Sequence, residues 1–189
     1  MTSVLPPLEV AGRLDRLRSG FDGAGIDALV VTCLTNIRYL TGFTGSAGEL
    51  LVGADGALLV TDGRYAEQAP SQVVDSGTEV AIAGTNRRSL VTDHLSSSDR
   101  VGLEAASVTW SDQRRLAGWF DGIDLVPTEG LVEELRQVKD PGEVARIEAA
   151  AAIADAALAD AAELLAVGVS ERDLAAAIDH GIRSRGADD

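Results

Sequence analysis

The class of fold is decided by one stretch, residues 49–61, which reads Glu49-Leu50-Leu51-Val52-Gly53-Ala54-Asp55-Gly56-Ala57-Leu58-Leu59-Val60-Thr61. Two short apolar runs flank a polar, glycine-rich centre, and the Asp-Gly pair in that centre is a strong signal for a tight turn. The stretch therefore predicts a β-hairpin, with strands at 49–52 and 57–61.

Short apolar runs and segments of helical spacing alternate on both sides of this hairpin. The runs have the length and composition of buried strands, and they lie at residues 27–32, 78–82, 101–104 and 123–126. Helices are predicted at residues 10–24, 36–40, 87–95 and 111–120. Strands that alternate with helices predict an α/β domain with helices on both faces of a mostly parallel sheet, which the hairpin makes mixed.

The end of this first domain is predicted near Pro127, so that it covers residues 1–127, and a linker helix is predicted at 128–139. A strong helix start follows at Asp140-Pro141-Gly142-Glu143. Asp140 can cap free N–H groups, proline suits the first helical position, and Glu143 stands where it completes a capping box. This helix is expected to run to Val167.

Residues 140–189 are predicted to hold that helix and a second one, which begins after Ser170. No strand follows for the two helices to cover. We therefore expect them to be the first two helices of a second domain, and we expect the residues most suited to chemistry to lie beyond Asp189.

The composition excludes several classes of function. A net charge of −14 and an isoelectric point near 4.4 argue against binding to nucleic acid or to an anionic membrane surface. The single cysteine, Cys33, cannot form an internal disulfide or a cysteine zinc cluster. Residues 1–8 do not have the pattern of a signal peptide, and no apolar run reaches the ~20 residues of a membrane span. These features are typical of a cytoplasmic protein.

A glycine-rich loop reads Gly42-Phe43-Thr44-Gly45-Ser46-Ala47-Gly48. A phosphate-binding loop would follow a strand and precede a helix, with a lysine in the nucleotide-hydrolase case. Here a helix precedes the loop, a strand follows it, and no lysine is present. The loop is therefore either a tight passage into the hairpin or a place where the backbone approaches a ligand or a partner subunit.

The turn after the hairpin reads Thr61-Asp62-Gly63-Arg64-Tyr65. It could fix the end of the strand through hydrogen bonds and an ion pair. It could also present Arg64 and Tyr65 to a neighbour, because Arg and Tyr are enriched in interfaces.

No metal site or catalytic triad is predicted. The two histidines, His94 and His180, lie far apart in the sequence, and neither Ser46 nor Ser111 has a histidine nearby. The acidic residues of the long C-terminal helix are expected to form a solvated face.

Four ordered motifs resemble the N-terminal region of the Xaa-Pro peptidase family, which includes aminopeptidase P, prolidase and creatinase. They are Asn36-Ile37-Arg38-Tyr39-Leu40-Thr41-Gly42-Phe43, Thr61-Asp62-Gly63-Arg64-Tyr65, Arg136-Gln137-Val138-Lys139-Asp140-Pro141-Gly142-Glu143 and Gly168-Val169-Ser170-Glu171-Arg172-Asp173-Leu174.

The resemblance implies a creatinase/prolidase N-terminal domain of ribonuclease-H-like layout, followed by two helices of an incomplete pita-bread catalytic domain. Family members use two divalent metals, commonly manganese or cobalt, held by two Asp, one His and two Glu, to activate a water that attacks the bond before proline. All five ligands belong to the family pattern beyond Asp189. No catalytic residue and no metal ligand is therefore assigned to this chain, and it is expected to bind no cofactor itself.

In such enzymes the N-terminal domain helps to form homo-oligomers and narrows access to the active site. The residues expected to take part, at an interface or at the active-site rim, are Asn36, Arg38, Tyr39, Phe43, Arg64 and Tyr65. The leading hypothesis is the N-terminal portion of a cytoplasmic peptidase for proline-containing peptides, inactive by itself. The alternatives are a stand-alone module for oligomerisation or interaction with a partner, and the N-terminal part of a creatinase-like C–N hydrolase.

Overall fold

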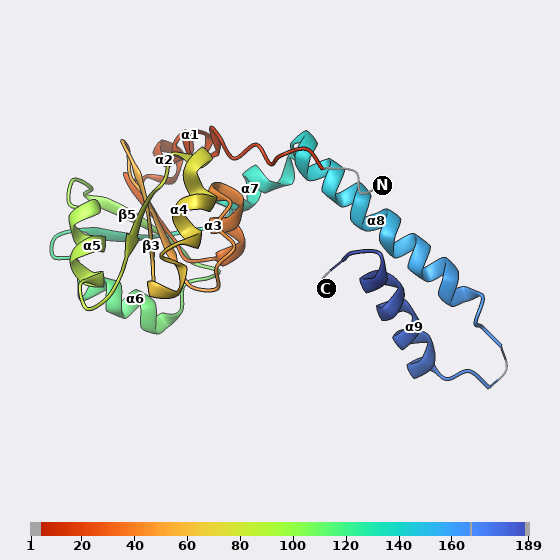
Figure 1. The fold of residues 1–189 in the computed structure, drawn as a ribbon. Helices are drawn as coiled ribbons and strands as arrows, with labels where there is room; N and C mark the ends of the chain where they lie inside the picture. The colour runs from red at the N-terminus through yellow and green to blue at the C-terminus, as the bar shows by residue number, and fades with distance from the viewer. Residues whose placement is uncertain (1–4, 167, 188–189) are drawn as a thin grey trace. The chain divides into compact units, whose positions relative to one another are not determined.

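The computed structural model describes residues 5–166 and 168–187 (Figure 1). Two compact units are present. One comprises residues 10–138, and the other comprises the described residues of 1–9 and 139–189. The first unit contains a sheet with helices, and the second contains two helices.

The sheet of the first unit has six strands in the order β4-β3-β2-β1-β5-β6. Neighbouring strands pair in parallel, except that β2 is antiparallel to both β1 and β3. The predicted mixed, mostly parallel sheet is therefore confirmed. The strands are β1 (Ala28–Val31), β2 (Glu49–Val52), β3 (Ala57–Thr61), β4 (Glu79–Ile82), β5 (Arg100–Glu104) and β6 (Asp124–Thr128).

The predicted hairpin is strands β2 and β3. Leu50 pairs with Leu59, and the Gly53 N–H donates to the Gly56 carbonyl at 2.9 Å to close the turn. All nine residues of the two strands are buried. Burial on both faces explains why these strands are continuous apolar runs rather than alternating ones.

Helices cover both faces of the sheet (Figure 1). One face packs against α1 (Arg13–Arg18), α2 (Phe21–Ala24), α3 (Leu34–Thr41), α4 (Gln68–Val73) and α7 (Leu131–Gln137). The other face packs against α5 (Arg87–His94) and α6 (Trp110–Ala117). Alternate residues of the central strand divide between the two cores, since Leu29 and Val31 face the first and Ala28 and Val30 the second.

The structure differs from the predicted helices in two places of this unit. The helix expected over residues 10–24 starts only after Gly12, whose φ of 73° is left-handed, and it is interrupted at Ser19 and Gly20. The helix α4 and two short 3₁₀ turns, η1 (Gly63–Tyr65) and η2 (Val74–Ser76), were not predicted. In α4 only Ala69 and Val73 are buried, and two positions are too few to make a periodic pattern.

The second unit contains α8 (Pro141–Ala162) and α9 (Glu171–Ser184), each with a capping box at its start. The helix α8 ends at Ala162, earlier than the predicted Val167, which lies outside the described residues. Its end is tightened by bonds from the Leu164 N–H to the Ala161 carbonyl and from the Leu165 N–H to the Ala162 carbonyl. These i→i−3 bonds replace the α-helical pattern.

The two helices approach each other through small residues. Ala157 and Ala161 of α8 and Gly181 of α9 are buried. A Cβ added at Gly181 would lie only 3.1 Å from the Ala157 Cβ. Ile147 and Leu158 of α8, by contrast, are 55% and 58% exposed.

Gly102 in β5 gives a test of the packing of the sheet. A Cβ there would lie 2.8 Å from a methyl of Ile26 and 2.9 Å from methyls of Leu29 and Thr128. We expect Gly102→Ala to lower the free energy of unfolding by about 1–3 kcal/mol through overpacking. Urea denaturation followed by circular dichroism measures this change.

The matched control is Gly23→Ala, because a Cβ at Gly23 meets nothing within 4 Å. This change in α2 should leave stability unchanged or raise it by up to about 1 kcal/mol. An equal loss in both variants would contradict the packing described for β5.

Candidate functional site

Phe43, Ser46 and Tyr65 gather where α3 ends and the hairpin begins. The helix stops at Gly42, whose φ of 84° is left-handed and whose N–H donates to the Arg38 carbonyl at 2.8 Å. A left-handed glycine is a common helix C-terminus because it avoids the strain of a Cβ. The loop of residues 43–48 then leads directly into β2.

An aromatic pair fixes this loop. Phe43 is 1% exposed, and its ring meets that of Tyr65 edge to face, with centroids 5.3 Å apart at 85°. Such pairs contribute beyond their buried area. A Cβ at Gly45 would lie 2.2 Å from a Phe43 ring atom, so only glycine fits there. The loop is therefore a tight passage held by an aromatic contact.

The hydroxyl of Tyr65 bonds to the same loop. It accepts a hydrogen bond from the Ser46 N–H at 2.9 Å and shares another with the Ser46 Oγ at 2.7 Å. These bonds from Ser46 lower the pKa of Tyr65 below its usual value. Four residues before Tyr65, at the end of β3, the Thr61 hydroxyl donates to the Ala47 carbonyl at 2.6 Å.

Asp62 and Arg64 form a self-contained turn beside the aromatic pair. The Asp62 carboxylate accepts from the Arg64 backbone N–H at 3.0 Å and from its guanidinium at 3.0 and 2.8 Å. These hydrogen bonds hold the pKa of Asp62 below its ordinary value. The guanidinium also lies 5.2 Å from the centre of the Tyr65 ring. The Arg64 side chain remains 65% exposed.

A shallow groove of about 320 Å³ runs between α3 and this loop. Arg38 is exposed on the helix side, and no hydrogen bond or ion pair holds its guanidinium within the described part of the chain. The loop side is stabilised by glutamines of α4, since the Thr44 N–H donates to Gln72 at 2.9 Å and Gln68 donates to the Thr44 hydroxyl at 3.0 Å. The groove thus combines a solvent-facing cation with a fixed loop.

Asn36 lies at the other end of α3, fully buried in a polar network. Its Nδ2 donates to Glu104 at 2.7 Å and to Glu133 at 2.6 Å. Its Oδ1 accepts from Arg136 at 3.0 Å. The amide is therefore bonded through both of its polar atoms, and it joins α3 to the end of β5 and to α7.

Tyr39 is buried as well and connects α3 to two other helices. Its hydroxyl donates to the Leu135 carbonyl of α7 at 3.2 Å. The guanidinium of Arg13 lies 4.0 Å from its ring centre, and the same group donates to the Tyr39 carbonyl at 2.5 Å. The structure thus divides the six expected residues: Asn36, Tyr39 and Phe43 are buried, Tyr65 is partly buried, and Arg38 and Arg64 are exposed.

Sequence reasoning missed Glu104, Glu133 and Arg136 as partners of Asn36. The only available signal was position, because Glu104 ends a predicted parallel strand, and the ends of such strands are frequent places for functional groups.

The described residues do not fit a two-metal centre. Among them, no group of three or more His, Cys, Asp or Glu side chains is placed to hold a metal ion. His94 lies on α5, where burial lowers its pKa, and His180 lies on α9 of the other unit. No helix within the described ranges has the length and apolar character needed to cross a membrane.

Comparison with known proteins identifies this arrangement. Residues 13–138 match the creatinase/prolidase N-terminal domain. A peptidase of Bacillus subtilis, the uncharacterized YqhT, is 37% identical over 178 residues, which is 93% of this chain and 50% of that protein. The chain therefore belongs to the creatinase/prolidase family.

Two solved structures extend the comparison. The Xaa-Pro dipeptidase from Bacillus anthracis has a TM-score of 0.88 and 34% identity over 93% of this chain and 49% of its own. The N-terminal domain of cytoplasmic peptidase PepQ from Mycobacterium tuberculosis has a TM-score of 0.60 and 39% identity over 67% of this chain and 99% of its own. The chain spans about half the length of the full-size relatives that it matches.

The bond between Ser46 and Tyr65 gives a test of the loop geometry by pH titration. Ser46→Ala removes the hydroxyl partner, so the pKa of Tyr65 should rise towards its ordinary value. The difference between variant and parent in tyrosinate absorbance near 295 nm, followed between pH 8 and about 12, measures the shift, because the other tyrosine, Tyr39, is common to both proteins. The stabilisation that comes from a depressed pKa appears only as pH rises through that pKa, so the variant should lose more stability relative to the parent at alkaline pH than at neutral pH.

Thr44→Ala is the matched control, since Thr44 bonds to Gln68 and Gln72 and not to Tyr65. It should leave the titration of Tyr65 unchanged. If the pKa of Tyr65 is the same in Ser46→Ala as in the parent, the contact between Ser46 and Tyr65 is absent in solution.

Proposed function

We propose that this chain forms the N-terminal part of a metal-dependent Xaa-Pro peptidase, which hydrolyses the peptide bond preceding proline in the cytoplasm. One observation carries the proposal. The match to the Xaa-Pro dipeptidase of Bacillus anthracis covers 93% of the chain, so it includes residues of both the sheet unit and the helical unit. The cytoplasmic location is supported by the Mycobacterium tuberculosis relative, which is a cytoplasmic peptidase.

In this proposal the sheet unit shapes access to an active site and contributes to a homo-oligomer. The exposed cations Arg38 and Arg64 would form the rim. Guanidinium groups bind carboxylates well, so they suit the free carboxyl terminus of a short peptide. Asn36, Phe43 and Tyr65 would act indirectly, since their contacts hold α3 and the loop of residues 43–48 in place.

The metal pair that the family uses would supply an activated water for attack on the peptide bond. The described residues do not provide its ligands. No catalytic step is therefore assigned to a side chain of this chain, and the proposal gives these residues only positioning and binding roles.

A chimera tests the proposal. This chain would be joined to the half of the Bacillus anthracis dipeptidase that follows the matched region, and hydrolysis of a Xaa-Pro dipeptide would be measured with manganese present. We expect the chimera to cleave the dipeptide and the chain alone not to. Arg38→Ala in the chimera should raise KM about two- to fivefold with little change in kcat, because an exposed ion pair contributes ~1 kcal/mol or less.

Arg16→Ala, which removes another exposed arginine away from the groove, is the matched control and should not alter KM. Turnover by the chain alone would overturn the assignment of the catalytic residues to the other half. A folded, metal-loaded chimera that hydrolyses creatine and not the dipeptide would replace the peptidase proposal with a creatinase-like C–N hydrolase.

A further inference from the structure

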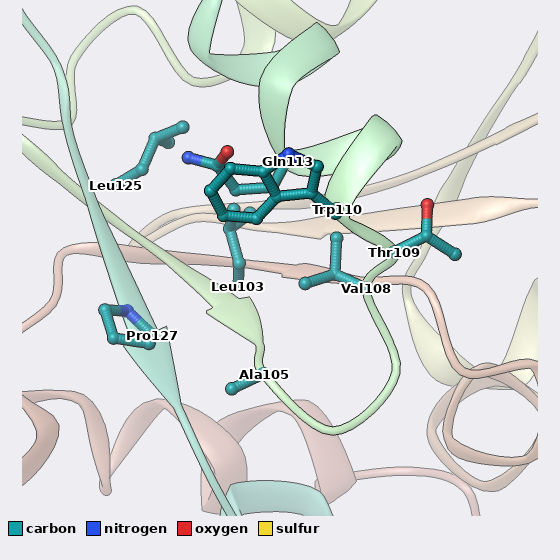
Figure 2. A pocket seen from close by; sticks show the side chains of 8 residues that line it. All are labelled: Leu103, Ala105, Val108, Thr109, Trp110, Gln113, Leu125 and Pro127. Carbon is teal, nitrogen blue, oxygen red and sulfur yellow. The ribbon is translucent and has the colours of Figure 1, made fainter.

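An apolar pocket of about 320 Å³ lies at the β6 side of the sheet (Figure 2). None of the described residues that line it also lines the groove beside α3. Side chains of two neighbouring strands form one wall, and the start of α6 with the loop before it forms the other. The wall residues are Leu103, Leu125 and Pro127 from the strands and Val108, Trp110 and Gln113 from the loop and helix.

Trp110 stands at the rim of this pocket with 75% of its surface exposed. It is the first residue of α6, and that helix start is fixed because the Thr109 hydroxyl accepts from the Asp112 N–H at 3.1 Å. A solvent-exposed tryptophan beside an apolar pocket is typical of a binding site, because Trp is enriched among the residues that contribute most of the binding energy.

The pocket adjoins an open edge of the sheet, because β6 is the outermost strand on this side. The Asp124 N–H donates to the Asp99 carbonyl at 2.8 Å, and the Ala105 N–H donates to the Thr128 carbonyl at 2.9 Å. In a parallel ladder, alternate residues direct both backbone groups to the same side. Leu125 and Pro127 therefore direct theirs outward, where an extended segment can pair with them.

Pro127 makes this edge unusual. It has no N–H, so the edge offers the N–H and carbonyl of Leu125 and the carbonyl of Pro127. In a strand added in parallel, the residue opposite Leu125 would place its side chain on the pocket face and direct its own N–H away from the edge. A proline at that position would lose no hydrogen bond and would bring its ring to the aromatic rim.

Charge favours a peptide over a second copy of the chain as the occupant. At a net charge of −14, the chain attracts a basic peptide, whereas a second copy at this edge would meet repulsion that its other contacts would have to offset. We propose that the pocket and the β6 edge form a docking site for an extended, proline-containing basic peptide, added parallel to β6 with proline opposite Leu125. The choice of proline rests in part on the proposed peptidase function. The open edge and the apolar pocket support a docking site independently of that function.

Tryptophan fluorescence of the chain itself tests the docking site. The protein has two tryptophans, so Trp119→Phe leaves Trp110 as the only tryptophan. The probe is the acetylated, amidated heptapeptide Lys-Val-Pro-Val-Lys-Val-Lys. We expect a saturable blue shift of Trp110 emission, since the indole becomes less exposed when the peptide binds.

Two changes should weaken this binding by about tenfold or more, a factor that matches the loss of one buried aliphatic group or of hydrogen bonds to the edge. One is Ala105→Phe, which fills the pocket from its rim. The other is methylation of the backbone nitrogens of the two valines after proline, which removes the donors to Leu125 and Pro127. Ala106→Phe, at a neighbouring exposed residue outside the pocket lining, is the control and should bind like the parent.

Absence of a saturable shift at millimolar peptide would overturn the docking site, as would unchanged binding by Ala105→Phe or by the methylated peptide. A peptide with glycine in place of proline that binds equally well would overturn the preference for proline. If Trp110 emission instead changes with protein concentration alone, and sedimentation shows a dimer, the occupant is a second copy and the proposal is wrong. None of these results depends on cleavage, so they are separable from the activity of the chimera.

Discussion

The hydrogen bonds that the Glu104 carboxylate accepts are the interaction on which the arrangement of the sheet unit depends. The carboxylate is buried, and it accepts hydrogen bonds from the Thr32 N–H at 2.6 Å, the Cys33 N–H at 2.8 Å and the Asn36 Nδ2 at 2.7 Å. A buried charge is costly unless its hydrogen bonds are made. Here the donors come from the start of α3, where the helix dipole also favours an anion.

The consequences of this contact extend along α3 to the candidate site. Asn36 also forms hydrogen bonds with Glu133 and Arg136 of α7, and the Tyr39 hydroxyl donates to the Leu135 carbonyl of α7. These bonds fix α3 against α7. With α3 fixed at its start and along its length, Gly42 ends the helix at a defined point. The loop that follows can then place Phe43 against Tyr65. Arg38, in the last turn of α3, thus owes its position to buried contacts at the start of the same helix.

Local patterns in the sequence predicted the strands, the hairpin and most helices, because each of these depends on residues close together in the chain. The capping box at Asp140 and the Asp-Gly turn at residues 55–56 are examples. The short helix α4 was missed because its buried positions are few. The partners of Asn36 were missed because Glu104 and Arg136 lie 68 and 100 residues away, and no local signal joins them. Two motifs, at residues 36–43 and 61–65, supplied the six candidate residues, yet they carried no information on which of them are buried.

Under the proposed function this network would have a role. The same helix that Glu104 anchors carries Arg38 beside a groove, and the proposed function places a peptide there. The docking site proposed at β6 lies elsewhere on the same sheet. Strand β5 contributes to both the groove and the docking site, because Glu104 at its end anchors α3 and the neighbouring Leu103 lines the apolar pocket.

Hydrogen exchange in a Glu104→Gln variant tests the central claim most directly. An amide side chain has one carbonyl oxygen to accept bonds and brings an NH₂ group against donors, so the start of α3 should loosen. The account predicts faster exchange at Thr32 and Cys33 and also at Phe43 and Ser46, which Glu104 does not touch. Faster exchange at the start of α3 with unchanged protection of the 43–46 loop would contradict the claim that this carboxylate positions the site.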